Sequence, residues 1–503
     1  MTATTTSRLL LINVPNSQVL SAAPNAMASK SHAYNTFSLP LSMLYLYDAV
    51  KHLCNVDILD LNIYKPIDID SCDPLFYIDI ITQKLKSFKP AYVGISALTS
   101  YGMKDILQIA KTVKKDNENI TIVIGGMHAT LYYKEIIDNC RLIDIVVVGE
   151  GEDALRKIIE GEKLSKIQSI AFRDMSGNYC YNPRTTYIEN LDNWDFKSYD
   201  KFNLEDYQPY DIDNWYDPRK LGIKNPTSIL TSRSCPNKCN FCSMSKVMGL
   251  KCRMKSAQKT YAAIEYLYSC KDVNYFHIQD DNFTLNKRRV IEICNLIVKN
   301  RLRIYMDTPN GVMVSTLDEE VIDALYQAGL IKINLAIESG SEFIRNNVIK
   351  KRLSLDQLFK AVAAIRKYPE IYISSFFIVG FPEETLQTLE DTVNLIKELD
   401  IDKITLNKLA PLPGTNLFAQ CIRDKLFTKE FNPDTAWENA DYSSMSTFSN
   451  WHIKPYAIGL DTLDRYYETI ISLSNEKSAY AHKKYNRVLA NTNIPKNLEE
   501  SEQ

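Results

Sequence analysis

The first 150 residues alternate short apolar runs with longer stretches of helical periodicity. Each apolar run ends at a Pro, a Gly or a polar residue, which is typical of a strand that is buried on both faces of a sheet. Regular alternation of such strands with helices predicts a doubly wound parallel sheet. The expected strands are 8–15, 56–61, 92–98, 121–126 and 144–152.

A second series of apolar runs begins at residue 227 and predicts another sheet. The starts of successive runs lie 29 to 47 residues apart, and a βα unit takes about 30 residues. Six such units predict a partial (β/α)6 barrel, whose chemistry is expected at the rim formed by the strand ends. The expected strands are 227–235, 274–281, 303–310, 332–340, 372–380 and 403–411.

The stretches without this pattern mark the domain borders. Residues 184–226 are rich in Asp, Asn and Tyr, and we expect an ordered linker that packs by its aromatic side chains. The pattern weakens again after about residue 415, where two helical stretches precede a polar end. The expected domains are 1–183 (Rossmann-like), 184–226 (linker), 227–414 (partial barrel) and 415–503 (a small, mainly helical region for substrate or accessory contacts).

The length, charge and apolar runs of the chain limit its number of domains, its partners and its compartment. The 503 residues are too many for one core, and a net charge of −2 gives no reason to expect nucleic acid or an anionic membrane as a partner. No apolar run approaches the length of a membrane span, and the first residues lack the features of a signal peptide. We therefore expect a cytoplasmic protein, in which the eleven cysteines are metal ligands or buried thiols rather than disulfides.

One loop gathers three of these cysteines. In "SRSCPNKCNFCSM" (232–244), Cys235, Cys239 and Cys242 follow the first strand of the predicted barrel. Three closely spaced thiolates can hold three corners of a cubane iron–sulfur cluster and leave one iron open for a substrate. Two alternatives remain, namely a structural zinc site with Cys252 as the fourth ligand and buried cysteines that bind no metal.

The CxxxCxxC spacing at this place resembles the radical S-adenosylmethionine (SAM) superfamily. The resemblance covers about residues 8–415 and implies a [4Fe–4S] cluster whose fourth iron chelates SAM and cleaves it to methionine and a 5′-deoxyadenosyl radical. The implied cluster ligands are Cys235, Cys239 and Cys242. Later segments that resemble these enzymes, in the expected order, are "FHIQDDNFTLNK" (276–287), "LAIESGSEFIRNNVIKK" (335–351) and "FFIVGFPEETLQTLEDT" (376–392).

The same resemblance implies contacts with SAM. Phe241 matches the aromatic residue that lies against adenine, and Glu338 matches a contact of the SAM hydroxyl or amino groups. The second strand of the barrel ends in Asp-Asp-Asn, where many relatives carry Gly-Gly-Glu, and Phe376 replaces the first Gly of the pattern that backs the adenine. The implied SAM contacts are Phe241, Asp280, Asp281, Asn282, Glu338, Ile378 and Gly380.

Some of these residues also have a purely structural interpretation. Asp280 and Asp281 could form a solvated strand end or a helix cap. Glu338 could be the partner in a structural ion pair. The segment "GFPEET" (380–385) also predicts a turn followed by a helix N-cap.

The first domain resembles a cobalamin-binding domain. One expected strand ends at Ser96 and Leu98, and the next ends at Gly125 and Gly126, where missing side chains let a bulky ligand approach the backbone. In cobalamin domains these two loops line the slot for the nucleotide tail, and "VVVGEGEDAL" adds to the match. The implied cobalamin contacts are Ser96, Leu98, Gly125, Gly126, Gly149 and Glu150.

One element of many cobalamin domains is missing. The DxHxxG motif, whose His binds cobalt from below, has no counterpart after the first strand, where "NVPNSQVLSAAPN" contains no His, and His32 lacks the spacing. This departure fits the radical SAM branch, which commonly lacks that His. His128 is nearest to the slot. We expect a neutral imidazole that satisfies a loop carbonyl, with cobalt ligation as the alternative.

The resemblance implies a cobalamin-dependent radical SAM enzyme that methylates an unactivated carbon of a small molecule or biosynthetic intermediate. Cyclisation or rearrangement, with or without cobalamin, is an alternative within the same family. An alternative from another class is a non-catalytic cobalamin carrier with structural zinc. The implied partners are a small-molecule substrate and a reductant such as a flavodoxin or ferredoxin.

Overall fold

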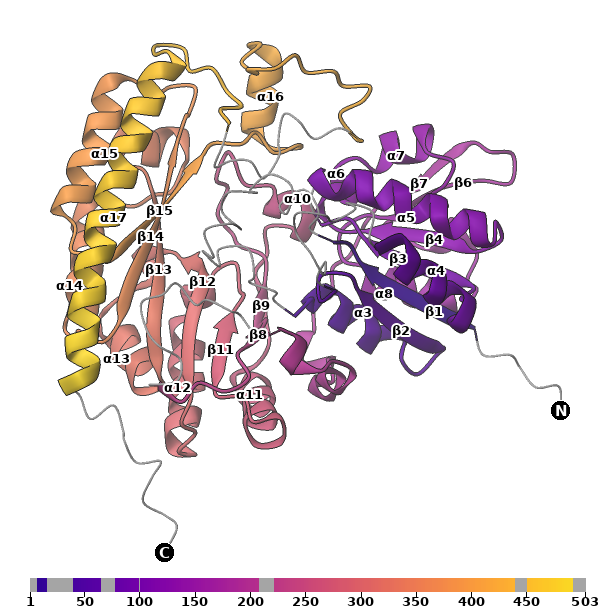
Figure 1. Cartoon of the computed structure of the whole chain (residues 1–503), viewed down its shortest axis with the longest axis horizontal. Helices are drawn as coiled ribbons and strands as arrows, with labels where there is room; N and C mark the ends of the chain where they lie inside the picture. Colours follow the sequence, from indigo (N-terminus) through magenta and orange to yellow (C-terminus); the bar gives the residue numbers. More distant parts are fainter. Residues whose placement is uncertain are drawn as a thin grey trace, which may run out of the picture. The chain divides into compact units, whose positions relative to one another are not determined.

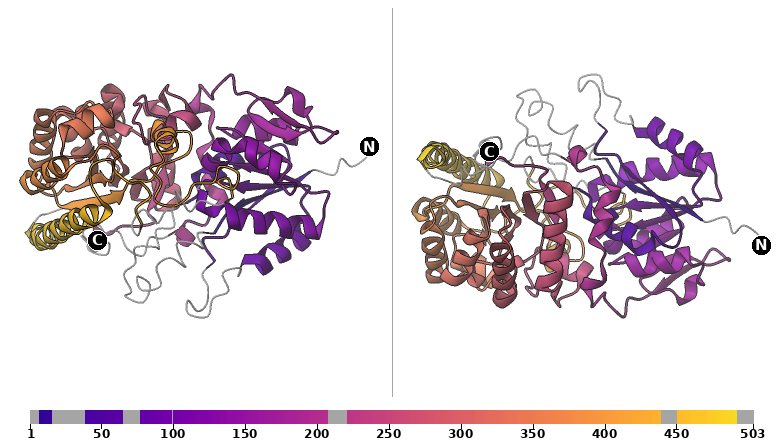
Figure 2. Two further views of the ribbon diagram at one scale, coloured as in Figure 1. Left: turned by 90° about the horizontal axis from the view of Figure 1, so that it is seen from above. Right: turned by 90° about the horizontal axis from the view of Figure 1, so that it is seen from below.

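The computed structural model describes residues 7–15, 39–64, 77–98, 100–207, 221–438 and 450–491. The chain forms two compact units, and each is assembled from separate stretches of sequence. The colours of Figure 1 and Figure 2 follow the sequence, so that the stretches within each unit can be traced. Unit 1 comprises Met1–Gln208, Arg233–Met254 and Ala410–Ile453, and unit 2 comprises Pro209–Ser232, Lys255–Leu409 and Lys454–Gln503.

Unit 1 is built on a seven-stranded sheet in the order β2-β1-β3-β4-β5-β6-β7. Strands β1 to β5 are parallel, and β6 and β7 add an antiparallel edge. Residues Leu9 to Ile12 are fully buried, as expected of a strand covered on both faces. The strands are β1 (Arg8–Asn13), β2 (Asn55–Asp60), β3 (Tyr92–Ser96), β4 (Thr121–Gly125), β5 (Ile145–Val147), β6 (Ile170–Arg173) and β7 (Tyr179–Asn182).

Helices cover this sheet in two layers, in which α3 packs against α8 and α4 packs against α5. The five strands expected in the first 150 residues are all present, and the predicted doubly wound parallel sheet is confirmed. The antiparallel pair β6–β7 was not predicted. The helices are α3 (Leu41–Val50), α4 (Tyr77–Phe88), α5 (Met103–Asp116), α6 (Met127–Leu131), α7 (Tyr133–Asn139) and α8 (Glu152–Ile159).

Unit 2 holds a six-stranded sheet in the order β15-β14-β13-β12-β11-β8, with every neighbouring pair parallel. The strands follow chain order from one edge to the other, so the sheet is an open, partial barrel, and all six predicted strands are present. The strands are β8 (Thr227–Ile229), β11 (Tyr275–Ile278), β12 (Tyr305–Val312), β13 (Leu330–Glu338), β14 (Tyr372–Val379) and β15 (Lys403–Lys408).

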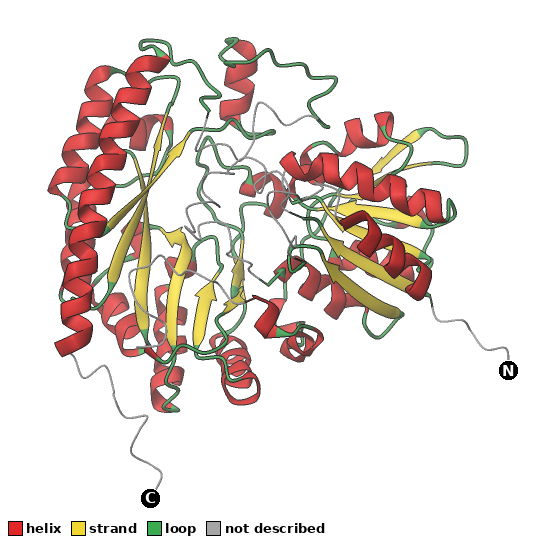
Figure 3. Ribbon diagram, in the orientation of Figure 1, coloured by secondary structure: helices red, strands yellow, loops and turns green. Residues whose placement is uncertain are grey.

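The helices of unit 2 line one side of its sheet (Figure 3). Side-chain caps fix the starts of α11 to α15. Thr385 accepts a hydrogen bond from Thr388 N–H in a capping box, which confirms the N-cap predicted from "GFPEET". The helices are α11 (Ala257–Lys271), α12 (Lys287–Lys299), α13 (Glu319–Gln327), α14 (Leu355–Arg366), α15 (Leu386–Glu398) and α17 (Leu460–Asn491).

The linker packs by aromatic side chains, as predicted, in the part of 184–226 that the structure describes. The Trp194 ring lies 5.2 Å from that of Tyr45 and 5.8 Å from that of Tyr199, measured between centroids. Trp194 is buried together with both tyrosines. These contacts attach residues 184–207 to unit 1.

The two units divide the chain differently from the expected domains 227–414 and 415–503. The cysteine loop belongs to unit 1, and the residues after β15 are shared, with Ala410–Ile453 in unit 1 and Lys454–Gln503 in unit 2. A hydrogen bond explains why Ala410–Ile453 belongs to unit 1, because the Leu417 N–H donates to the carbonyl of Asn240 in the cysteine loop at 3.1 Å. The C-terminal residues therefore do not form one separate region.

Helix α17 covers the open edge strand β15 (Figure 1). Ser474 is buried in this contact. Its hydroxyl donates to the carbonyl of Ile404 at 2.9 Å and accepts from the Ile404 N–H at 3.2 Å. One side chain thus satisfies both backbone groups of an edge residue that, among the described residues, has no neighbouring strand on this side. Although α17 is long, no helix in the described ranges is apolar enough over a sufficient length to cross a membrane.

We predict that Ser474→Ala destabilises the protein by about 1–3 kcal/mol, because two buried backbone groups lose their partner. Urea unfolding followed by circular dichroism measures the change. Ser472→Ala is the matched control, since Ser472 is exposed on the same helix and should leave the unfolding midpoint unchanged. Equal midpoints for the two variants would contradict the role given to Ser474.

Candidate functional site

Cys235, Cys239 and Cys242 lie on a loop between β9 (Ser232–Arg233) and α10 (Met244–Met248). The Cys242 N–H donates to the Cys239 carbonyl at 3.2 Å and closes a turn. Cys235 and Cys239 are half-buried, Cys242 is exposed, and none forms a disulfide. Within the described residues, no three His, Cys, Asp or Glu side chains converge on one metal-sized point. Three soft thiolates on one loop are nevertheless the ligands that a cubane cluster takes.

Charged side chains anchor both ends of this loop. Arg233 precedes it and Arg253 of β10 (Arg253–Met254) follows it, and both bind the carboxylate of Glu150 at 2.7–2.8 Å. Glu150 is one of the predicted cobalamin contacts. Its carboxylate is engaged by the two arginines, so contact with cobalamin remains a prediction for its backbone.

The carboxyl ends of β3 and β4 bring predicted cobalamin residues together. Ser96 pairs in register with Gly125, and the N–H of the next residue, Ala97, donates to the Gly125 carbonyl at 2.6 Å. Leu98 follows and is 60% exposed, so it presents apolar surface at the strand end. The two loops therefore form one edge that offers both backbone and apolar contacts to a ligand.

Gly126 allows these two loops to pack closely. Its φ of +124° lies in a region that residues with a side chain rarely adopt, and a Cβ there would come within 2.7 Å of the carbonyl carbon and oxygen of Ala97. Gly149, at the end of β5, also has a positive φ of +90°, but the Arg184 guanidinium fills the space that its Cβ would take. Gly126 is thus the glycine that this edge requires.

His128 uses both of its ring nitrogens within unit 1. Nε2 lies 2.8 Å from the carbonyl of Trp437, and Nδ1 lies 2.9 Å from the hydroxyl of Ser100. Because a carbonyl only accepts, Nε2 carries the proton and Nδ1 accepts from Ser100. Burial lowers the pKa of His128 to about 4, so the ring is neutral. The expected neutral imidazole that satisfies a loop carbonyl is confirmed, and ligation of cobalt would break one of these hydrogen bonds.

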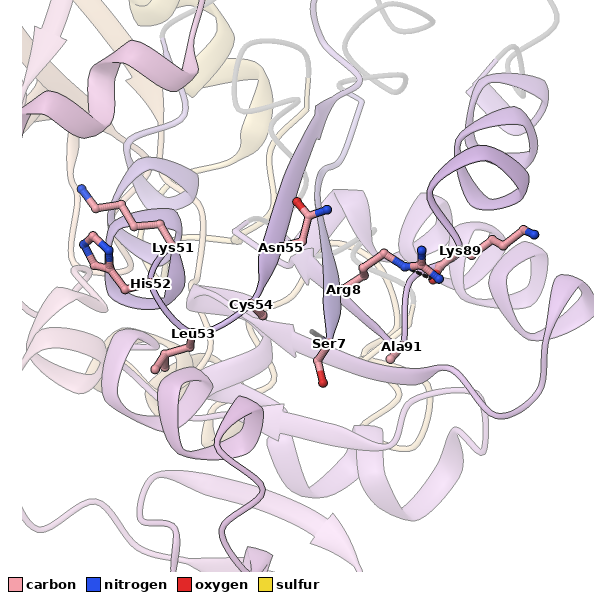
Figure 4. A pocket seen from close by; sticks show the side chains of 9 residues that line it. All are labelled: Ser7, Arg8, Lys51, His52, Leu53, Cys54, Asn55, Lys89 and Ala91. Atoms are coloured by element: carbon pink, nitrogen blue, oxygen red, sulfur yellow. Dashed lines mark hydrogen bonds between the residues drawn. The ribbon is translucent and has the colours of Figure 1, made fainter. Parts of the chain in front are cut away.

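A pocket of about 760 Å³ lies at the opposite, amino-terminal edge of the same sheet (Figure 4). It is open and mostly polar, and Arg8 Nε donates across its wall to the carbonyl of Lys89 at 2.9 Å. The residues that sequence analysis singled out lie at the other ends of the strands. This pocket therefore has no place in the candidate site.

In unit 2, the carboxylate of Asp280 is occupied by hydrogen bonds from the residues that follow the first strand, β8. Its carboxylate accepts hydrogen bonds from the Thr231 N–H at 2.5 Å and from the hydroxyls of Thr231 and Ser232, each at 2.6 Å. Asn282 lies two residues further on, is 1% exposed, and its Nδ2 has no partner within the described residues. The amide of Asn282 is thus the group at this strand end that has donor capacity left for a ligand, while Asp281 is half-buried.

Glu338 ends β13 with a φ of +72° and forms a buried ion pair with Lys351, whose Nζ lies 2.8 Å from Oε1. Both side chains are 8% exposed. Lys350 and Arg352, which flank Lys351, also have positive φ values, 69° and 58°. The backbone on both sides of Lys351 therefore adopts unfavourable conformations that turn this ammonium toward Glu338.

The turn after β14 is organised by a buried acid. The Gly380 N–H donates to Oε2 of Glu384 at 2.6 Å, and Gly380 itself has a φ of +103°. Burial raises the pKa of Glu384 to about 8, so the group is largely a neutral acid at pH 7. Ile378 precedes this turn and is 9% exposed. Phe241 is half-buried on the cysteine loop of unit 1.

Residues 229–396 match the radical SAM superfamily, and residues 34–159 match the B12 binding domain. An uncharacterized methyltransferase, PH0819, of Pyrococcus horikoshii is 30% identical over 416 residues, which cover 81% of this chain and 84% of that protein. The chain belongs to the B12-binding radical SAM enzymes.

Other similar proteins differ in their named activities. The anaerobic magnesium-protoporphyrin IX monomethyl ester cyclase of Rubrivivax gelatinosus is 27% identical over 366 residues, or 70% of this radical SAM enzyme and 62% of the cyclase, so the match spans less than two thirds of the latter. The structure of the methyltransferase TsrM from Kitasatospora setae, with tryptophan and a SAM analogue bound, has a TM-score of 0.68, covers 93% of this chain and 88% of that one, and is 17% identical. The latter shows a shared fold.

The cofactors of this radical SAM enzyme are a [4Fe–4S] cluster, SAM and cobalamin, as in its family. The residues fit these groups. Three thiols share one loop, Asn282 holds an orphaned buried donor at a strand end, and Gly126 keeps the edge beside Leu98 without a side chain. A structural zinc site and a non-catalytic cobalamin carrier, which the sequence left open, do not agree with this membership.

Sequence reasoning missed several residues of this radical SAM enzyme that organise the site. Lys351 gave no signal, because its role depends on a positive φ on either side of it. Nothing in the sequence distinguishes Arg253 from the other arginines, because its burial against Glu150 depends on contacts between distant segments. Glu384 lies within "GFPEET", a segment whose residue types predict only a turn and a cap.

We predict that Gly126→Ala weakens cobalamin binding about tenfold or more, since a loss of 1.4 kcal/mol is sufficient. The added Cβ collides with Ala97 and displaces the edge, while the cluster content should stay unchanged. Titration followed by visible absorbance measures the affinity. Gly161→Ala is the matched control, because Gly161 also has a positive φ (+77°) but no atom within 4 Å of the added Cβ. Equal losses in the two variants would show that backbone strain, and not the edge, is responsible.

We predict that Lys351→Met lowers SAM affinity about tenfold or more, because it leaves the buried Glu338 carboxylate without its cation. Lys350→Met is the matched control, since Lys350 is the adjacent, exposed lysine. Calorimetric titration of the reconstituted protein with SAM gives the affinity, and Lys351→Arg should restore part of it. Unchanged affinity together with a lower unfolding midpoint would show that the pair serves stability alone.

Proposed function

We propose that this enzyme is a C-methyltransferase that acts on an unactivated carbon of a small molecule or biosynthetic intermediate. In the overall reaction, one substrate C–H bond becomes C–CH₃. Two SAM molecules and two electrons are consumed, and S-adenosylhomocysteine, 5′-deoxyadenosine and methionine are released. When bound, the cluster supplies the electron that cleaves SAM, and cobalamin carries the methyl group.

This proposal rests on which segments of the chain form unit 1. The cysteine loop and the edge formed by Ser96, Gly125 and Gly126 belong to the same compact unit. A protein that must use a radical centre and a methyl carrier on one substrate needs both in fixed positions. The names of two similar proteins give further support, the methyltransferase PH0819 and the cytidylyl-2-hydroxyethylphosphonate methyltransferase of Streptomyces wedmorensis, which is 26% identical over 377 residues.

Cyclisation is the second candidate. The cyclases of Rubrivivax gelatinosus and Cereibacter sphaeroides are 27% and 26% identical to this chain over 366 and 361 residues. Such a reaction would use the same cofactors but need not consume SAM as a methyl donor. Product analysis therefore separates the two candidates.

We propose that the segment Ala410–Ile453 determines substrate specificity. Within unit 1 it bonds to the cysteine loop through Leu417 and Asn240, and to α6 through Trp437 and His128. A segment that reaches both cofactor-bearing parts is well placed to contact a substrate that must meet both. We further infer a cytoplasmic location with a flavodoxin or ferredoxin as reductant, because the thiolate-bound cluster needs electrons and a reducing compartment.

We predict that the reconstituted enzyme, given its substrate and a reductant, forms S-adenosylhomocysteine and 5′-deoxyadenosine in equal amounts. Anaerobic mass spectrometry of an extract supplied with SAM that carries a trideuterated methyl group should reveal one product heavier by that group. Turnover with 5′-deoxyadenosine but without S-adenosylhomocysteine would replace methylation by cyclisation.

A variant with Cys235, Cys239 and Cys242 all changed to Ala should bind no iron and form no 5′-deoxyadenosine. Its cobalamin binding serves as the control for folding. Zinc in stoichiometric amount in the unaltered protein, with little iron, would contradict the proposed ligands.

A further inference from the structure

The two ends of the cysteine loop meet at one carboxylate. Nη1 of Arg233 lies 2.8 Å from Oε1 of Glu150, and Nη1 of Arg253 lies 2.7 Å from each of the two carboxylate oxygens. The side chains of Arg253, Glu150 and Arg233 are 1%, 5% and 8% exposed. Because Arg233 precedes Cys235 and Arg253 follows Cys242, the Glu150 carboxylate holds the two ends of the cysteine loop together.

The acid that closes the loop belongs to the cobalamin edge. Glu150 follows Gly149 just beyond β5, the strand next to β4 in the sheet. Two residues later Glu152, at the start of α8, adds a contact of 2.5 Å to Nη2 of Arg233. The loop after β5 therefore touches both ends of the cysteine loop.

The surroundings of Glu150 leave its carboxylate little freedom. Oε2 also accepts from the Ile188 N–H at 3.1 Å, and Arg253 donates to the Ile188 carbonyl at 2.9 Å. Burial raises the pKa of Glu150, but the charges and hydrogen bonds of Arg233 and Arg253 outweigh burial and hold this pKa below its ordinary value. Loss of the acid would leave two guanidinium groups buried and undercompensated, which is costly.

We propose that Glu150 is a positioning residue that fixes the iron–sulfur loop against the cobalamin edge, so that cluster and cobalt keep one defined separation. This inference rests on the proposed cluster ligands and the proposed cobalamin edge. It does not depend on the choice between methylation and cyclisation, because both need the two cofactors in place.

Glu150→Gln tests the inference, since it keeps the shape of the side chain and removes the charge that holds two arginines. Each cofactor should still bind, in the amounts found for the unaltered protein, because the cysteines and Gly126 are unchanged and the predicted cobalamin contact of residue 150 is assigned to its backbone, which the substitution keeps. The reduced cluster and cob(II)alamin are both paramagnetic, so pulsed dipolar electron paramagnetic resonance reports their separation directly. We expect one narrow distance distribution in the unaltered protein and a clearly broader one in Glu150→Gln.

Glu160→Gln is the matched control. Glu150 lies just before α8, and Glu160 lies just after it. The side chain of Glu160 is 38% exposed, and among the contacts that the structure gives it, it pairs only with Arg156. The distance distribution should stay narrow in this variant. Arg253→Lys is the second test variant, because lysine keeps the charge but lacks the planar fork that engages both Glu150 and Ile188.

An unchanged, narrow distribution in Glu150→Gln would overturn the inference. If Glu150→Gln fails to retain both cofactors, Arg253→Lys decides, with a broadened distribution as the supporting result and an unchanged one as the contrary result. The measurement requires no substrate. Absence of the cluster from the unaltered protein would instead refute the proposed ligands, so the two failures are distinguishable.

Discussion

Parallel pairing places the carboxyl ends of all strands of a sheet at one edge, and both units of this enzyme depend on that constraint. In unit 1 it sets Ser96 beside Gly125, although 28 residues separate them in sequence. In unit 2 it gathers the ends of β11, β13 and β14, with Asn282, Glu338 and Gly380, along one edge. Because helices make the crossovers, the chain at that edge consists of loops, and a rigid sheet holds them.

Buried carboxylates do much of the positioning at these edges. Asp280, Glu150 and Glu338 were each assigned to a ligand by resemblance, and each is engaged by donors from the protein. Burying a carboxylate is costly unless donors surround it, so an acid at such a place must acquire partners. The partners of Glu150 are Arg233 and Arg253, which lie before and after the three cysteines. Glu150 therefore joins the loop after β5 to the cysteine loop, whatever direct contacts it also makes.

The sequence was informative wherever one segment determines its own conformation. Apolar runs identified the parallel strands of both sheets, and cysteine spacing predicts the loop that holds the cluster. Contacts between distant segments were not predictable. Nothing in local periodicity joins Asn240 to Leu417, or Arg253 to Glu150, and the strained backbone around Lys351 has no pattern of residue types. The sequence offered Gly125 and Gly126 together, and only the packing of Ala97 against Gly126 distinguishes the one that cannot bear a side chain.

The interleaving of the units has a consequence for biosynthesis of the enzyme. Domains generally fold as they emerge from the ribosome, N-terminal part first. Unit 1 cannot be completed in this way, since it needs Ala410–Ile453, which is synthesised after all six strands of the sheet of unit 2. Its segment around Leu417 also contacts the loop that carries the cysteines. Insertion of the cluster into a finished site must therefore follow translation of residue 453, and the nascent chain carries its cysteine loop incomplete until then.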